Sequence, residues 1–224
     1  MAATTLIFGG IGTLVETSTY QRLAFNRAFA KLGIDFAWSA GDYAASLSDT
    51  GGEKRLAAIR LPGGGALTAA QIAAVHDAKT RLFEAILADE RLTLRAGAAG
   101  LIAQARDHGI PLAWATTTSR ANIDAVIAAT GGALTAGMFV FVGDDRQVQR
   151  QKPDPEIYTK ILTFLAADPA QAIAIEDSPT GVRAARAAGV HTVAFPGEMH
   201  RRTDFAAADA VVETLGDVAA MLLR

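Results

Sequence analysis

The stretch IAIEDSPTGVRAARAAG, residues 173–189, joins a strand pattern directly to a helix pattern. It begins with a short apolar run, passes through two carboxylates and a serine, and continues with small and apolar residues at helical spacing. Gly189 follows at a position where helices commonly end. A short apolar run that leads straight into a helix predicts a parallel strand buried on both faces.

The same pattern of a short apolar run followed by a helix recurs along the chain. We expect strands at residues 5–8, 111–115, 138–142, 172–175, 191–195 and 209–212. We expect helices at residues 98–108, 120–129, 155–165, 180–188 and 215–223. This alternation predicts an α/β fold built on a doubly wound parallel sheet.

One long segment interrupts the alternation. Residues 18–89 contain no convincing strand, whereas residues 20–32 carry an apolar stripe at helical spacing and residues 69–88 form a second long helical pattern. We therefore predict a helical domain at residues 17–91, inserted into a core domain made of residues 1–16 and 92–224.

Composition excludes several classes of function. The chain has 224 residues, half of them hydrophobic, no cysteine and a net charge of −2. Thiol catalysis and zinc–thiolate sites are therefore excluded, and no basic excess favours nucleic acid or a membrane surface. No apolar run approaches the roughly 20 residues of a membrane span, and the N-terminus lacks signal-peptide features. We expect a cytoplasmic protein; its oligomeric state is not readable from the sequence, and most of its four scattered histidines are expected at the surface.

The segment ATTTSR, residues 115–120, follows one expected strand and opens a helix. Hydroxyl groups and free backbone N–H groups at a helix N-terminus suit a phosphate, which makes Thr116 and Thr117 candidate phosphate ligands. The alternative is that one of these hydroxyls simply caps the helix.

Two further motifs carry charge. Lys152 precedes a proline in QKPDPEIY, residues 151–158, where it is either a fixed cation for an anion or, as the motif alone favours, a solvated lysine before a helix. Glu176 and Asp177 end an expected strand, where adjacent carboxylates are costly to bury without a cation. Mg²⁺ prefers such oxygen ligands, and we favour a metal site over the alternative that Asp177 or Ser178 caps the helix.

The first expected strand leads into LIFGGIGTLVET, residues 6–17. A strand-to-helix loop at this edge of a sheet is where many α/β enzymes hold a catalytic group. Between Phe8 and Glu16, however, only Thr13 has a polar side chain. The loop has the setting of an active site without a nucleophile or a proton shuttle.

These motifs, in this order, resemble the haloacid dehalogenase (HAD) superfamily, in its β-phosphoglucomutase and CbbY-type sugar-phosphate phosphatase branch. The resemblance covers the whole chain and rests on KPDPEIY, on EDSPTGVRAA and on residues 16–17 and 24–26. It implies a HAD-like Rossmannoid core with an inserted helical cap domain, and a small phosphorylated metabolite or anion as the partner.

The resemblance also implies roles for individual residues. Thr116 matches the hydroxyl residue that holds the transferring phosphoryl group, and Lys152 matches the lysine that balances its charge. Asp177, together with Glu176, matches the acidic pair that binds Mg²⁺. The cap loop that contacts the sugar phosphate in relatives corresponds to Gly51, Gly52, Lys54 and Arg55.

The sequence departs from the family's first motif at two positions, and Gln21 replaces a histidine found in close mutase relatives. Relatives carry Asp-x-Asp-Gly-Thr-Leu where this chain has Gly9 and Ile11 before an intact Gly-Thr-Leu. The first aspartate is the covalent nucleophile and a metal ligand, and the second is the general acid and base, whose loss alone costs roughly 10²–10⁴-fold. Mg²⁺ binding is therefore expected to be weakened, and Lys152 is expected to pair with Asp177 or Glu176.

Four hypotheses follow. The first is a catalytically degenerate member that binds a phosphorylated small molecule or an anion. The second is an active Mg²⁺-dependent phosphatase or phosphomutase that uses a substitute group such as Asp144 or Asp145. The third is a non-catalytic protein that binds a partner, and the fourth is deliberate replacement of both aspartates.

Overall fold

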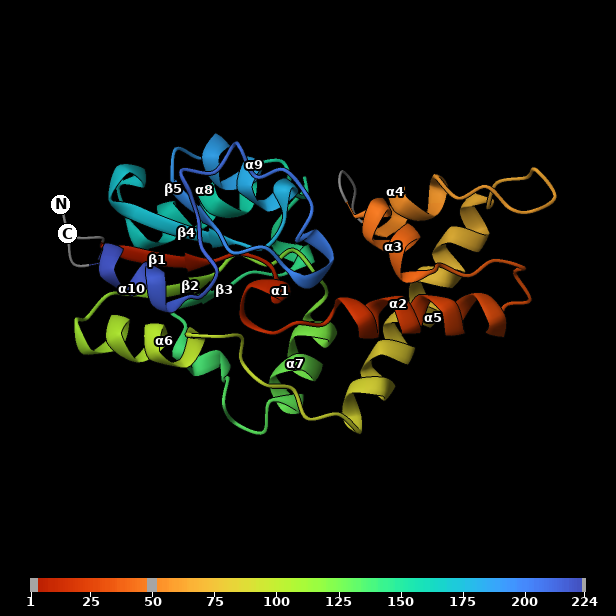
Figure 1. Cartoon of the computed structure of the whole chain (residues 1–224), viewed down its shortest axis with the longest axis horizontal. Helices are drawn as coiled ribbons and strands as arrows, with labels where there is room; N and C mark the ends of the chain where they lie inside the picture. The colour runs from red at the N-terminus through yellow and green to blue at the C-terminus, as the bar shows by residue number, and fades with distance from the viewer. Residues whose placement is uncertain (1–3, 48–51, 223–224) are drawn as a thin grey trace.

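The computed structural model describes residues 4–47 and 52–222. Its centre is a six-stranded sheet in the order β3-β2-β1-β4-β5-β6, in which every neighbouring pair is parallel (Figure 1). The strands are β1 (Thr5–Phe8), β2 (Leu112–Trp114), β3 (Phe141–Val142), β4 (Ala172–Glu176), β5 (His191–Ala194) and β6 (Ala210–Val211). This arrangement confirms the predicted parallel sheet.

Helices cover both faces of the sheet, and successive side chains of β1 point to opposite faces. Leu6 and Phe8 pack with α6 (Ala98–Asp107), α7 (Arg120–Ala129) and α10 (Gly216–Leu222) in one hydrophobic cluster. Ile7 packs with α8 (Glu156–Leu165) and α9 (Pro179–Ala187) in another. Two separate apolar layers, one on each face, are what a doubly wound sheet requires.

The expected boundaries were wrong in places. The strand expected at residues 138–142 is shortened to β3 because Ala136–Met138 form a 3-10 turn, in which the Met138 amide donates to the Thr135 carbonyl. Leu223, at the end of the last expected helix, lies outside the described residues. Short helices not foreseen from the sequence are α1 (Ile11–Leu14) and three other 3-10 turns at Asp145–Gln147, Pro169–Gln171 and Glu198–His200.

Four helices between β1 and β2 form a separate group, here called the helical insertion: α2 (Ser18–Lys31), α3 (Ala40–Ser46), α4 (Gly52–Ala57) and α5 (Ala69–Ala88). They enclose an aromatic cluster of their own, in which the Trp38 ring meets the Phe25 and Phe29 rings at centroid distances of 5.2 and 5.3 Å. The group lies to one side of the sheet in Figure 1. The exact domain boundaries, at residues 17 and 92, stay a prediction.

The two chain segments that join the helical insertion to the sheet lie side by side. The Arg95 amide donates to the Leu14 carbonyl at 2.9 Å, and the Leu215 amide donates to the Ala96 carbonyl at 2.9 Å. Gly97 follows with a φ of +83°, and a β-carbon at this position would overlap the backbone nitrogen of Gly216.

Among the described residues, no helix is long and apolar enough to cross a membrane.

This close approach predicts that Gly97→Ala destabilises the fold more than Gly131→Ala. Both glycines have positive φ, so both alanines carry a left-handed cost of about 1–2 kcal/mol. Gly131 has open space around its α-carbon, whereas Gly97 has backbone. Urea denaturation is expected to show an additional loss of roughly 2 kcal/mol or more for Gly97→Ala, and equal losses for the two variants would contradict the packing argument.

Candidate functional site

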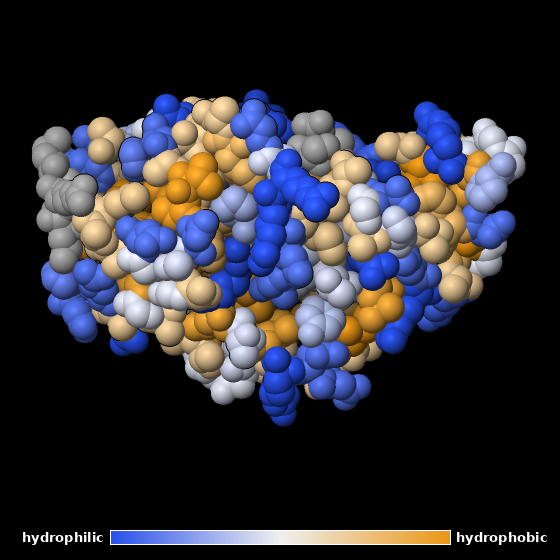
Figure 2. Space-filling model, in the orientation of Figure 1, coloured by the Kyte–Doolittle hydropathy of each residue, from blue (hydrophilic) through white to orange (hydrophobic). Residues whose placement is uncertain are grey.

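A cavity of about 790 Å³ lies beyond the carboxyl ends of the strands, where the sheet faces the helical insertion. Figure 2 shows hydrophilic side chains running across the middle of one face of the molecule, between these two parts. Most residues predicted for the site line the cavity, namely Ile11, Thr116, Thr117, Lys152, Glu176, Asp177, Gly52, Lys54 and Arg55. Gly9 is buried next to it, and Gly51 lies outside the described residues.

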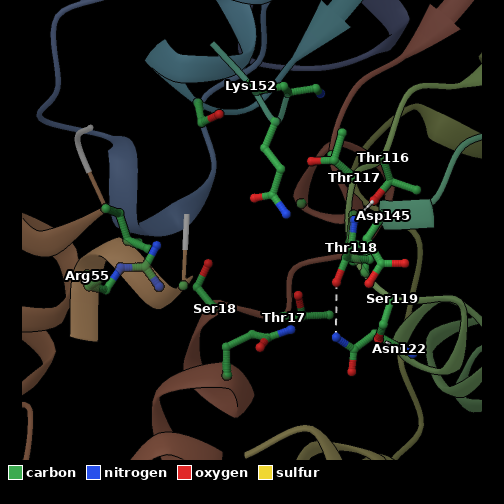
Figure 3. A pocket seen from close by; sticks show the side chains of 18 of the residues that line it. Thr17, Ser18, Arg55, Thr116, Thr117, Thr118, Ser119, Asn122, Asp145 and Lys152 are labelled. Atoms are coloured by element: carbon green, nitrogen blue, oxygen red, sulfur yellow. Dashed lines mark hydrogen bonds between the residues drawn. The ribbon is translucent and has the colours of Figure 1, made fainter. Parts of the chain in front are cut away.

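The hydroxyl-rich loop after β2 forms one wall of the cavity (Figure 3). Ser119 caps α7, because its side chain accepts a hydrogen bond from the Asn122 amide. The Asn122 side chain donates to the Thr118 hydroxyl at 3.0 Å. The capping function predicted as an alternative therefore belongs to Ser119, while Thr116 and Thr117 also line the cavity.

Lys152 forms an ion pair with Glu176, as the sequence predicted. Its side chain is only 11% exposed, so the alternative of a solvated lysine was wrong. The Tyr158 hydroxyl donates to the same carboxylate oxygen, and burial followed by the charge of Glu176 raises the pKa of Tyr158, which keeps its proton. The other oxygen of Glu176 is buried and has no hydrogen-bond partner among the described residues.

The Glu176 carboxylate lies between two glycines. A β-carbon built on Gly9 or on Gly181 would overlap the carboxyl carbon of Glu176. The absence of a side chain at position 9 therefore leaves the space that Glu176 fills. Sequence reasoning recognised that Gly9 lacks a reactive group but not that its small size admits another carboxylate.

Asp177 lies beside the loop that follows β1. Its carboxylate accepts a hydrogen bond from the Thr13 hydroxyl at 3.2 Å, and Gly12 has no side chain to separate them. Desolvation, and then the neighbouring charge of Glu176, raise the pKa of Asp177 to about 6. The helix cap at α9 is Ser178 and not Asp177, because the Ser178 side chain accepts from the Gly181 amide.

The acidic groups do not form a complete metal site in this arrangement. The described residues contain no group of three His, Cys, Asp or Glu side chains that could hold a metal ion. Glu176 already binds Lys152 and Tyr158, and the other carboxylate of the predicted pair, Asp177, accepts a hydrogen bond from Thr13. The donor set therefore does not fit Mg²⁺ without a rearrangement of Glu176.

The two substitute carboxylates considered from the sequence differ in their surroundings. Asp144 is buried and caps a 3-10 turn, where it accepts a hydrogen bond from the Arg146 amide at 2.9 Å. Asp145 lines the cavity on the same side as the hydroxyl-rich loop (Figure 3). Only Asp145 therefore faces the space where a ligand would bind.

The helical insertion contributes cations to the opposite wall. Arg55 lies over the Tyr43 ring and donates to the Ser46 carbonyl at 3.2 Å. Lys79 is 6% exposed, and its ammonium lies 5.0–5.4 Å from the ring centroids of Phe83 and Phe25. It forms no ion pair with the described residues, and burial, with Arg55 nearby, lowers its pKa to about 8. Lys79 could not be recognised from the sequence, because it lies within the mostly apolar pattern of α5.

His200 is a second lining residue that sequence reasoning missed. It is an exception to the prediction that most histidines lie at the surface, because it is 6% exposed and lines the cavity. Its Nδ1 atom is buried, and none of the residues that the structure describes forms a hydrogen bond with it. The residue follows β5 in a short turn whose polar sequence gives no signal of burial.

Comparisons with known proteins agree with this geometry. The model of the haloacid dehalogenase-like hydrolase family matches residues 5–189. Protein CbbY of Rhodobacter capsulatus is 43% identical over 204 residues, which cover 91% of this chain and 90% of the relative. Protein CbbY of Cereibacter sphaeroides is 38% identical and covers 95% and 93% of the two chains.

Solved structures give the same result. CbbY from Rhodobacter sphaeroides in complex with phosphate has a TM-score of 0.87 at 38% identity and covers 96% of both chains. An Asp→Asn variant of that protein in complex with xylulose-(1,5)bisphosphate matches equally well. A β-phosphoglucomutase from Clostridium difficile, at 18% identity and a TM-score of 0.77, shares the fold. This chain belongs to the haloacid dehalogenase-like hydrolase family, in the branch of the CbbY proteins.

Proposed function

We propose that this chain binds a phosphorylated small molecule between its core and its helical insertion, which acts as a cap, and does not transfer the phosphoryl group. The observation that carries the proposal is the position of the Glu176 carboxylate, which fills the space beside Gly9. In the family that this chain resembles, the residue at position 9 is the nucleophile, and the general acid and base stands at the position of Ile11. Neither residue offers an atom that could attack phosphorus or move a proton.

Binding of an anion is supported by the charges that remain. Lys79 is a buried cation that forms no ion pair with the described residues, although the charge of Glu84 acts on it, and a bound phosphate would supply a further counter-charge. Thr116 and Thr117, with the N-terminus of α7, offer hydroxyl and backbone donors on the opposite wall. The CbbY structures with phosphate and with xylulose bisphosphate support a polyhydroxylated phosphate as the class of ligand.

The role proposed for Lys152 is structural as much as electrostatic, since its charge is largely neutralised by Glu176. With one carboxylate so engaged, Mg²⁺ is proposed to bind weakly, and no chemical step is assigned to it. On the cap, Gly52, Lys54 and Arg55 are proposed to contact the ligand. A cytoplasmic location also stays a prediction.

A second candidate is residual phosphatase activity with Asp145 as the substitute carboxylate. It is favoured by one observation, that Asp145 lines the cavity. Positioning and electrostatic stabilisation alone can retain some rate without the original nucleophile.

We predict that the unaltered chain does not hydrolyse p-nitrophenyl phosphate with Mg²⁺, and that Gly9→Asp/Ile11→Asp does. The carboxylate introduced at position 9 displaces Glu176 from its space and provides both a nucleophile and a third metal ligand. We expect a gain of at least about 10²-fold in turnover.

The matched control is Gly9→Asn/Ile11→Asn, which displaces Glu176 equally but has no nucleophile that could attack phosphorus. If the unaltered chain turns over substrate at a rate comparable to that of Gly9→Asp/Ile11→Asp, the proposal is wrong. Loss of that turnover in Asp145→Asn would then support the second candidate.

We also predict that Lys79→Met stabilises the protein while weakening ligand binding. The folded-state pKa of about 8 lies below the ordinary 10.5, so the charged lysine destabilises the fold below pH 8. At about 1.4 kcal/mol per pKa unit, its removal gains up to about 3 kcal/mol at pH 7. Between pH 8 and 10.5 the unfolded chain binds more protons than the folded one. The unaltered chain therefore becomes more stable as pH rises, and the advantage of the variant disappears.

The measurements are thermal unfolding against pH and calorimetric binding of xylulose 1,5-bisphosphate. The affinity of the unaltered chain should fall as pH rises through 8, whereas that of Lys79→Met should be weaker by roughly 10-fold at pH 7 and should not show this fall. Lys31→Met, at an exposed position of α2, is the control and should change neither quantity. Unchanged affinity in Lys79→Met would remove Lys79 from the binding site.

A further inference from the structure

His200 is held firmly at the point where the core meets the helical insertion. Its amide donates to the Gly197 carbonyl at 2.8 Å, and its carbonyl accepts from the Thr203 amide at 2.9 Å. The ring meets the Phe205 ring edge to face, with centroids 6.5 Å apart and an interplanar angle of 89°. The turn that carries it is therefore fixed before any ligand arrives.

The same turn is tied to both neighbouring parts of the site. The Gly197 amide donates to the Asp177 carbonyl at 3.0 Å, and the Glu198 amide donates to the Glu16 carboxylate at 2.7 Å. Glu16 lies in the segment that leads from β1 into the helical insertion. His200 is thus anchored to the acidic strand end and to one of the two connections between core and insertion.

The hydrogen-bonding capacity of the ring is unused by the protein. No described residue forms a hydrogen bond with either ring nitrogen of His200. Nδ1 is closed to solvent, so Nε2 is the ring nitrogen that remains available to a ligand in the cavity. An unsatisfied buried polar atom destabilises the fold, and an apolar side chain would pack against Phe205 without that cost. The imidazole therefore has no structural advantage in the free protein.

We propose that Nε2 of His200 forms a hydrogen bond with a hydroxyl group of the bound ligand and so selects polyhydroxylated phosphates over simple ones. This inference rests on the proposed binding function and adds the group that reads the carbon chain of the ligand. His200 acts here as a specificity-determining residue with no part in bond cleavage.

A hydroxyl suits this ring better than a phosphate does. Burial is the main cause that lowers the pKa of His200, to which nearby Arg55 adds, while Glu16 and Glu176 act in the opposite direction. A neutral imidazole has one donor and one acceptor nitrogen, and with no partner on Nδ1 to fix the tautomer, Nε2 serves in either role. A hydroxyl both donates and accepts, whereas a phosphate calls for the cations on the opposite wall.

The test compares two ligands that differ only along the carbon chain. Xylulose 1,5-bisphosphate carries a ketone and hydroxyl groups, and pentane-1,5-diol bisphosphate has the same two phosphates without either; 2-oxopentane-1,5-diol bisphosphate, which keeps only the ketone, is expected to behave as pentanediol bisphosphate does. Calorimetry is performed with the unaltered chain, with His200→Phe, which keeps the contact with Phe205, and with His200→Gln, which restores a polar group. We expect His200→Phe to weaken xylulose bisphosphate about 10-fold, with pentanediol bisphosphate within twofold and His200→Gln intermediate.

A direct readout accompanies the affinities. The ¹⁵N resonance of His200 Nε2, assigned by its disappearance in His200→Phe, is expected to shift with xylulose bisphosphate and not with pentanediol bisphosphate. Thermal unfolding verifies that both variants fold.

The outcomes separate this inference from the function on which it rests. If the unaltered chain binds neither bisphosphate, the proposed function falls and this inference falls with it. If the unaltered chain binds xylulose bisphosphate and His200→Phe binds it equally well, the inference alone is overturned. Equal weakening of both bisphosphates also overturns it, because the ring would then act on the phosphates or on the shape of the cavity.

Discussion

The arrangement of the site depends on one buried charge. Glu176 is fully buried, and a carboxylate in that position is tolerable only with a cation and hydrogen-bond donors around it. Lys152 and Tyr158 supply both, from the loop before α8 and from α8 itself. Two glycines give the carboxylate its space, one after β1 and one in α9. Four separate segments of the chain are therefore fixed relative to one another by a single side chain.

The rest of the cavity follows from this neutralised centre. Lys152 and Glu176 compensate each other, and the helical insertion contributes further positive charge to the cavity, at Lys79 and Arg55. The hydroxyl-rich loop after β2 lies on the opposite wall. An anion held between these walls contacts both parts of the molecule, so ligand binding and the relative position of sheet and insertion are linked in the proposed function.

Much of the fold could be predicted from the sequence because buried parallel strands are short and almost continuously apolar. The site positions on strand ends were predictable for the same reason, since the carboxyl ends of parallel strands meet at one edge. Lys79 and His200 could not be found, because burial of a polar residue depends on what packs around it in space. Only part of the role of Gly9 could be predicted. The sequence shows that position 9 lacks a carboxylate, but not that the carboxylate of residue 176 fills the space beside it.

The central position of β1 also has a consequence for how the chain folds. Leu6 pairs with Leu112 on one side and with Ile173 on the other, so both neighbours of the first strand are far along the chain. During synthesis this mostly apolar strand emerges long before either of its neighbours, and such an unpaired edge favours association with other chains. The aromatic cluster of residues 25–43, by contrast, is formed by contacts close in sequence, which form rapidly. The helical insertion can thus become structured before β4, the second neighbour of β1, has been synthesised.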